Sequence, residues 1–136
     1  MSMTGKCLCG AVRFIGKGAH TGIHVCHCSD CARWTGGPFM AIGFEDAIAV
    51  EGPVRWFQSS QWAERGSCAT CGSALFWRLQ DGSMMNVGVG NLDDRATLTA
   101  IDEHIYVDQK PPFYDFSDTA PRLTGAELLA RFEASQ

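Results

Sequence analysis

The chain has 136 residues, of which 46% are hydrophobic, so it is long enough to bury a core without disulfide bonds. Its 11 basic and 15 acidic side chains give a formal net charge of −4, and no long basic run occurs. A chain of this charge lacks the electropositive surface with which proteins bind nucleic-acid phosphates. We therefore expect a single domain over residues 1–136 that does not bind nucleic acid.

The N-terminal residues show no apolar segment of the signal-peptide type, and no stretch approaches the ~20 apolar residues of a membrane helix. We expect a cytoplasmic protein without membrane contacts, and nothing in the sequence points to an oligomeric state. In a reducing compartment, clustered cysteines are more often metal ligands than disulfides. The odd number of cysteines, seven, also argues against a complete set of disulfides.

Fifteen glycines and short alternating apolar runs predict a mainly β protein with tight turns. The first predicted strand is 6–15, in which Cys7 and Cys9 share a face because alternate residues of a strand point the same way. Gly10 can form a bulge that changes the face of the residues after it. The other strands are predicted at 21–26, 38–44, 47–51, 53–59, 62–67, 73–79, 83–89 and 103–107.

Two helices are predicted. A short helical turn at 29–34 is followed by two glycines, which commonly end helices. A C-terminal helix is predicted at 124–133, because Thr124 and Glu127 have the spacing of a capping box before an apolar face. The segment 108–122 contains three prolines and is predicted to be an ordered irregular loop.

All seven cysteines fall into three clusters, a C-x-C, a C-x-C-x-x-C and a C-x-x-C. Zn²⁺ commonly takes four protein ligands in a structural site, and three in a catalytic site that keeps one position open. Seven divides naturally as four plus three, which predicts one closed and one open zinc site. The clusters consist of Cys7 and Cys9, of Cys26, Cys28 and Cys31, and of Cys68 and Cys71.

The C-x-x-C is followed by Gly72 and has the form of a knuckle, which needs a second pair of ligands to complete a tetrahedron. The middle cluster differs, because its three cysteines come from one short segment and leave the opposite side of a metal uncovered. We expect that side to be open to a substrate.

Other ligand sets are compatible with the spacing. Pairing the last two cysteines of the middle cluster with the C-x-x-C would make a zinc ribbon, but it would leave the other three cysteines without a role. His24 has the strand parity of Cys26 and offers an alternative fourth ligand, although packing or hydrogen bonding is the commoner role of such a histidine. For acid–base chemistry the sequence offers only His27 and His104.

Taken together, these motifs resemble the glutathione-dependent formaldehyde-activating enzyme family, also called the Gfa-like or centromere protein V/Gfa domain. The resemblance extends from Lys6 to about Pro121, and the order of the three clusters makes it specific. The stretches that carry it are CLCG at 7–10, CHCSDC at 26–31, RGSCATCGSALFW at 65–77, GNLDD at 90–94 and HIYVD at 104–108.

This resemblance implies an Mss4-like fold of antiparallel sheets with zinc knuckles and a short C-terminal helix. It also implies two zinc sites with separate roles. The family's named reaction joins glutathione and formaldehyde into S-(hydroxymethyl)glutathione, and its members are classed as carbon–sulfur lyases. By position, the structural zinc would be held by Cys7, Cys9, Cys68 and Cys71, and the catalytic zinc by Cys26, Cys28 and Cys31.

We therefore expect a zinc-dependent carbon–sulfur lyase that acts on a thiol–aldehyde adduct, with the substrate thiol at the open three-cysteine zinc. Its partners would be a small-molecule thiol or its aldehyde adduct, and the three-cysteine site would be only partly occupied by zinc. The competing hypothesis is a non-enzymatic zinc-stabilised domain used for binding or as a scaffold.

Overall fold

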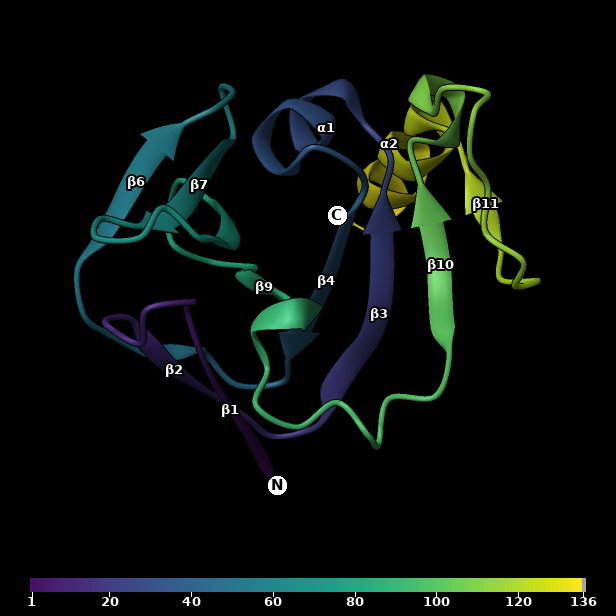
Figure 1. Cartoon of the computed structure of the whole chain (residues 1–136). Helices are drawn as coiled ribbons and strands as arrows, with labels where there is room; N and C mark the ends of the chain where they lie inside the picture. Colours follow the sequence, from purple (N-terminus) through teal and green to yellow (C-terminus); the bar gives the residue numbers. More distant parts are fainter. Residues whose placement is uncertain (136) are drawn as a thin grey trace. The chain divides into compact units, whose positions relative to one another are not determined.

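The computed structural model describes residues 1–135, so the last residue of the predicted 1–136 domain, Gln136, lies outside the description (Figure 1). The prediction of a mainly β chain is confirmed. The chain divides into two compact units, the first made of Met1–Gly22 and Ala41–Thr99, the second of Ile23–Met40 and the chain from Ala100 onward. That these units fold as a single domain stays a prediction.

The first unit contains a three-stranded antiparallel sheet of β1 (Ser2–Lys6), β2 (Arg13–Lys17) and β5 (Ala49–Glu51). The predicted strand at 6–15 is therefore wrong, since β1 and β2 are separated by a turn. Within that turn the Gly10 N–H donates to the carbonyl of Cys7 over 3.1 Å, and Gly10 has a φ of 82°. Such a positive φ suits glycine and breaks strand geometry, so the turn replaces the expected bulge.

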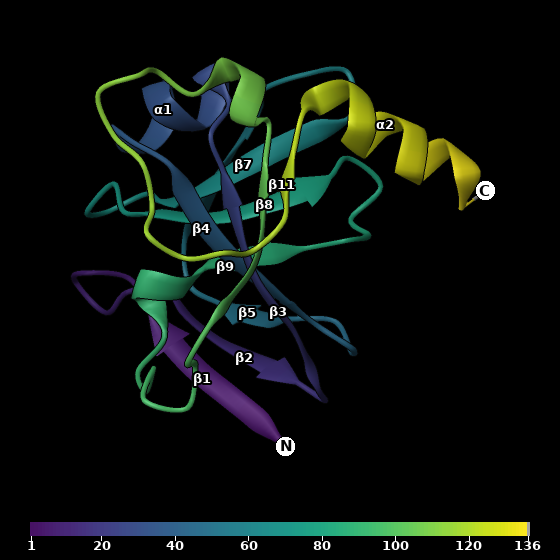
Figure 2. The ribbon, with the colours of Figure 1, turned by 90° about the vertical axis from the view of Figure 1, so that its right-hand side faces the viewer.

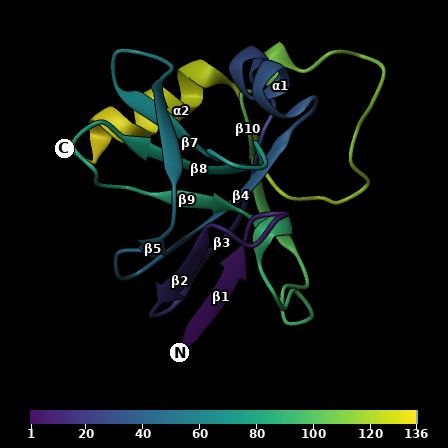
Figure 3. The same cartoon turned by 60° about the vertical axis from the view of Figure 1, so that its left-hand side comes forward.

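The other strands of the first unit form an antiparallel sheet, in which β7 (Ala63–Cys68), β8 (Ala74–Leu79) and β9 (Asn86–Gly88) lie side by side in Figure 3. The predicted strands of this region are confirmed in position to within a few residues. In spatial order the sheet runs β4 (Phe39–Phe44, from Ala41 in this unit), β9, β8, β7 and β6 (Val54–Gln58). A 3₁₀ turn, η1, spans Val89–Asn91.

Aromatic packing holds the first unit together. The ring of Phe14 on β2 meets the fully buried ring of Phe76 on β8 edge-on, with 5.6 Å between centroids. On β6, Trp56 stacks on Phe76 at 6.0 Å. Gly66 on β7 makes room for this indole, because a Cβ there would lie 2.9 Å from both Trp56 and Val54. Burial of these large rings contributes to this unit's stability.

The second unit is built on parallel strands. β3 (His20–Cys26, from Ile23 in this unit) pairs in parallel with β10 (Ile101–Ile105), and Figure 1 shows their arrows side by side. β10 also pairs in parallel with the short β11 (Arg122–Leu123), which leads into the C-terminal helix in Figure 2. Strand pairing in this protein is therefore partly parallel rather than wholly antiparallel. The helical elements of the second unit are α1 (Ser29–Thr35), the 3₁₀ turn η2 (Val107–Gln109) and α2 (Gly125–Ala134).

Both predicted helices are confirmed. α1 ends at Gly36, whose φ of 86° provides a left-handed C-cap. α2 begins with the expected capping box, in which the Thr124 hydroxyl accepts from the Glu127 N–H over 3.1 Å and the Glu127 carboxylate accepts from the Thr124 N–H over 2.9 Å. Within residues 1–135, no helix has the length and apolar character needed to cross a membrane.

An ion pair attaches α2 to β10. Both terminal nitrogens of Arg131 donate to the Glu103 carboxylate over 2.8 Å, and His24 Nδ1 lies 3.0 Å from the same carboxylate. The Glu103 side chain is 11% exposed. The hydrogen bonds from Arg131 are the largest influence on its pKa, which they lower against the opposing effect of burial.

We expect this pair to make the second unit sensitive to acid. Because the folded-state pKa of Glu103 lies below the ordinary value of 4.5, its stabilisation is complete above that value and is lost as pH falls through the folded-state pKa. Glu103→Gln should cost about 1.5–3 kcal/mol at pH 7. Denaturant unfolding of wild type and variant should give free energies that converge below pH 4.

Glu133→Gln, on an exposed position of the same helix, is the matched control and should differ little from wild type at any pH. A Glu103→Gln deficit that stays constant down to pH 3 would contradict the role given to the carboxylate.

Candidate metal centres

Four sulfurs of the first unit converge on one point. The Sγ atoms of Cys7, Cys9, Cys68 and Cys71 all lie within 4.8 Å of one another. Two of these separations are 3.6 Å, between Cys7 and Cys9, and 3.8 Å, between Cys9 and Cys68. Sulfurs held tetrahedrally at about 2.3 Å from a zinc ion stand roughly 3.8 Å apart. The spacing of this four-cysteine group therefore fits Zn²⁺.

Two turns aim these sulfurs. In the first, the Cys7 N–H donates to the Val12 carbonyl, and the Val12 N–H donates back to Cys7 Sγ over 3.3 Å. In the second, the N–H groups of Thr70 and Cys71 both donate to Cys68 Sγ over 3.4 Å. N–H donors of this kind favour the thiolate form, which is the form that binds metal. Cys7 and Cys9 thus meet through a turn, not because they share a strand face.

The surroundings of Cys71 favour the ionised form of its thiol. The Ser73 hydroxyl, 3.1 Å from its sulfur, and then the Ser73 backbone N–H lower the pKa of Cys71 to about 5. Ser73 also accepts a hydrogen bond from the Leu8 N–H over 3.0 Å. One hydroxyl therefore joins the C-x-C turn to the C-x-x-C knuckle.

The second unit holds a three-cysteine group. The Sγ atoms of Cys26, Cys28 and Cys31 also lie within 4.8 Å of one another. Cys26 ends β3, Cys28 is the N-cap of α1, and Cys31 lies in the first turn of that helix with only 3% of its surface exposed. The Cys28 sulfur accepts the Cys31 N–H over 3.3 Å, so one sulfur is both a helix cap and a candidate ligand.

Crowding sets the electrostatics of the three-cysteine group. Hydrogen bonding with Cys28, and then with Cys31, raises the pKa of Cys26 far above its ordinary value, and burial adds to the effect. Three thiolates at this spacing repel one another unless a cation lies among them. Soft thiolate donors select ions such as Zn²⁺ over Mg²⁺ or Ca²⁺, so the residues fit the expected metal. Within residues 1–135, no disulfide links any of these cysteines.

The alternative ligand sets do not match these groupings. The sulfurs of the C-x-x-C lie with those of the C-x-C, and not in the zinc-ribbon arrangement with Cys28 and Cys31. His24 hydrogen-bonds Glu103, which agrees with the packing or hydrogen-bonding role that the sequence favoured. That the two groups are the structural and catalytic zinc ligands stays a prediction.

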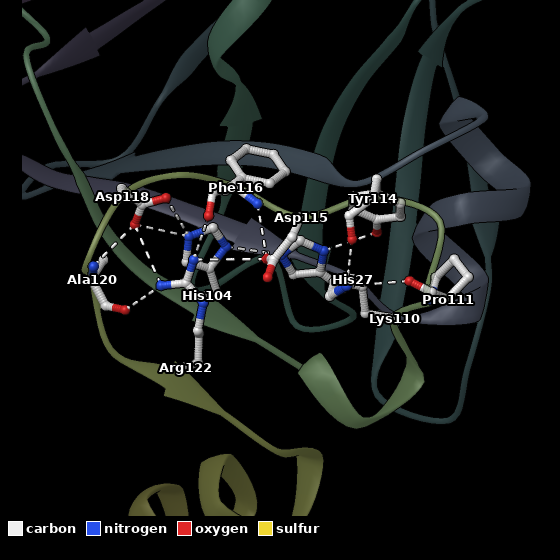
Figure 4. Close-up of polar contacts among 10 residues, drawn as sticks. All are labelled: His27, His104, Lys110, Pro111, Tyr114, Asp115, Phe116, Asp118, Ala120 and Arg122. Atoms are coloured by element: carbon white, nitrogen blue, oxygen red, sulfur yellow. Dashed lines mark hydrogen bonds and ion pairs between the residues drawn. The ribbon is translucent and has the colours of Figure 1, made fainter.

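Figure 4 shows a hydrogen-bond series that the sequence did not reveal, and one of its members, His27, stands between Cys26 and Cys28 in the sequence. The Tyr114 hydroxyl lies 2.9 Å from His27 Nδ1, His27 Nε2 lies 2.8 Å from His104 Nδ1, and His104 Nε2 lies 3.0 Å from both oxygens of Asp118. Burial, and then the positive charges of His104 and Lys110, lower the pKa of His27 to about 4. A His27 in this setting is a poor proton acceptor near neutral pH.

Sequence reasoning identified the two histidines of the hydrogen-bond series but missed Tyr114 and Asp118. Both lie in the irregular segment 108–122, where neither helical nor strand periodicity indicates which side chains turn inward. The three prolines of this segment predicted an ordered loop, but nothing in the sequence indicated which of its side chains form long-range hydrogen bonds.

A mainly β chain with a four-thiol group and a separate three-thiol group has the pattern of small proteins organised around thiolate metal sites. The glutathione-dependent formaldehyde-activating enzyme family matches residues 2–109, and this chain is a member of that family. It is also similar to a Schizosaccharomyces pombe protein named as an uncharacterized lyase. The two are 28% identical over 130 residues, covering 92% of this chain and 93% of the relative.

We expect Cys71→Ser to remove the metal of the four-cysteine group and to unfold the protein. Loss of a structural metal is among the few single changes that cost more than about 4 kcal/mol. Zinc content and thermal midpoint, measured together, check this expectation, with Ser67→Ala on the neighbouring strand as a control that should retain both. A Cys71→Ser protein with unchanged metal content and midpoint would refute the assignment.

Cys28→Ser should behave differently. Serine is among the best N-cap residues, so α1 should keep its cap and the folding free energy should change by less than ~1 kcal/mol. Metal content should fall only by the share of the three-cysteine group, as elemental analysis and circular dichroism would show. Unfolding as severe as that of Cys71→Ser would count against separate roles for the two groups.

Proposed function

We propose that this protein is a zinc-dependent carbon–sulfur lyase that acts on a thiol–aldehyde adduct at the three-cysteine group. The observation that carries the proposal is the convergence of three sulfurs, rather than four, from one short segment of chain. Membership of the family and the relative named as a lyase support the reaction class. The likeness to S-(hydroxymethyl)glutathione synthase suggests glutathione and formaldehyde as the first substrates to try.

The reaction can be written from the adduct side. The carbon–sulfur bond of an S-hydroxyalkyl thioether breaks, and its electron pair remains on sulfur. The hydroxyl group of the same carbon loses its proton as the carbonyl forms, so the products are a thiol and an aldehyde. Formation of the adduct is the reverse reaction.

Zn²⁺ held by three thiolates would supply an open coordination position that accepts a substrate sulfur and lowers the pKa of its thiol. The chain contributes rigid placement of the three donors. α1 fixes Cys28 and Cys31 through its first turn, and β3 fixes Cys26 through its pairing with β10. Such placement reduces the entropy that must be lost when the reacting groups meet.

The four-cysteine group has a structural role in this proposal. Its sulfurs come from two turns that are 59 residues apart in sequence between Cys9 and Cys68. A metal bound there would close that loop and stabilise the first unit, whereas one bound to the three-cysteine group would be held by a single segment. We therefore propose that the three-cysteine group is the more weakly and partly occupied site.

Cobalt substitution provides the test. Co²⁺ in a thiolate site has charge-transfer absorption that responds to an added sulfur ligand. Titration of the cobalt protein with glutathione and with cysteine should give saturable spectral changes, and Cys28→Ser should abolish them. A spectrum unaffected by every thiol would reject the lyase and favour a non-enzymatic zinc-stabilised scaffold. A response to cysteine but not to glutathione would retain the chemistry and discard glutathione as substrate.

A further inference from the structure

The short turn η2 binds the first residues of both helices. The Gln109 side-chain oxygen accepts the N–H of Ser29, the first residue of α1, over 2.9 Å. The Asp108 carboxylate accepts the N–H of Gly125, the first residue of α2, over 2.9 Å. Figure 2 shows this turn, in light green, between the two helices. Two consecutive side chains of η2 therefore provide acceptors for N–H groups that have no partner within their own helix.

Strained backbone precedes η2. β10 ends at Ile105, and Tyr106 turns the chain with a φ of 55°, a left-handed conformation that bulky side chains rarely adopt. Its ring covers Gly125, where a Cβ would lie 2.6 Å from the Tyr106 Cε1 atom. Such a conformation persists only where the surroundings hold it, and it is commonest at functional sites. A role for the side chains that η2 positions would account for this strain.

The peptide that Gln109 holds is the one that leaves Cys28. The Ser29 N–H belongs to the Cys28–Ser29 peptide bond, so Gln109 fixes the backbone of a candidate ligand directly. On the other side of Cys28, the His27 N–H donates to the Ile105 carbonyl over 3.0 Å. The end of β10 and the turn that follows it therefore hold the backbone of the three-cysteine group at two points that need no metal.

Gln109 is a second cap for α1, and it differs in kind from the first. The Cys28 sulfur accepts the Cys31 N–H over 3.3 Å, but that sulfur is also a candidate ligand, whose electron pairs a metal would share. A helix of seven residues is too short to be stable without contacts outside it. The Gln109 amide oxygen carries no charge to lose, and oxygen donors are poor partners for metals that prefer thiolates. Gln109 therefore provides a cap that a change of metal ligand leaves intact.

We propose that Gln109 is a positioning residue of the three-cysteine group, which keeps Cys28 and Cys31 in place while the fourth ligand of a bound metal is exchanged. This inference rests on the proposed function, because exchange of a substrate sulfur is what makes a metal-independent cap necessary. Gln109 acts through the Cys28–Ser29 peptide and takes no part in cleavage of the carbon–sulfur bond. Loss of this cap should loosen the first turn of α1, so the metal of the three-cysteine group should dissociate faster.

The first experiment measures the cap itself. In the zinc-loaded protein, Gln109→Ala should raise the hydrogen-exchange rate of the Ser29 N–H about three- to tenfold, the effect of one hydrogen bond. Gln109→Glu keeps an oxygen acceptor at the start of the helix and should retain the wild-type rate. Gln58→Ala, at an exposed position of the first unit, is the matched control and should not change it. An unchanged Ser29 rate in Gln109→Ala would overturn the proposal.

The second experiment measures what the cap does for the metal. Mixed with excess chelator, the cobalt-loaded protein should lose its absorption in two phases, and Cys28→Ser should remove the faster one. Gln109→Ala should speed that phase about three- to tenfold and leave the slower phase unchanged, whereas Gln109→Glu should release cobalt no faster than wild type. A merely structural role for Gln109 would speed both phases or neither, and either result would overturn the assignment.

Failure of this proposal can be told apart from failure of the proposed function. A wild-type cobalt spectrum that responds to thiols, with Gln109→Ala unchanged in both experiments, rejects Gln109 and leaves the lyase intact. A wild-type spectrum indifferent to every thiol, with faster Ser29 exchange and faster cobalt release in Gln109→Ala, rejects the lyase but supports Gln109 as the residue that positions the three-cysteine group.

Discussion

Mutual repulsion among crowded sulfurs is the constraint on which the rest of the molecule depends. Four sulfurs in one group and three in the other lie within 4.8 Å of their neighbours. Thiolates so close repel one another strongly unless a cation lies among them. The two turns of the first unit and the cap of α1 position these sulfurs through backbone hydrogen bonds. The packing of Phe14, Phe76 and Trp56 stabilises the strands that flank the two turns.

Each candidate metal group lies wholly within one compact unit, which supports the different roles proposed for the two groups. In the first unit, sulfurs from distant parts of the sequence meet, so a metal there acts as a crosslink. In the second unit, the sulfurs come from one short segment at the end of β3 and the start of α1, and the fold around them is also held by the Glu103–Arg131 pair and the capping box of α2. Loss of metal from the second group therefore leaves its scaffold supported.

The sequence was most informative where chemistry is encoded by spacing. Cysteines one and two residues apart identified both sulfur groups, and Thr124 with Glu127 located α2. The strand predicted at 6–15 failed because periodicity does not register a single glycine in a positive φ, which turns the chain at Gly10. Tyr114 and Asp118 were missed because long-range hydrogen bonds from an irregular loop leave no periodic trace.

The sulfur of Cys28 belongs at once to a helix and to a candidate metal ligand set. The cap becomes stronger as the sulfur gains negative charge, and it becomes weaker as a metal draws that charge away. The strength of the hydrogen bond from the Cys31 N–H to the Cys28 sulfur therefore depends on what that sulfur binds. Hydrogen exchange at the Cys31 N–H should therefore respond to what binds the Cys28 sulfur, because that hydrogen bond caps a helix of only seven residues.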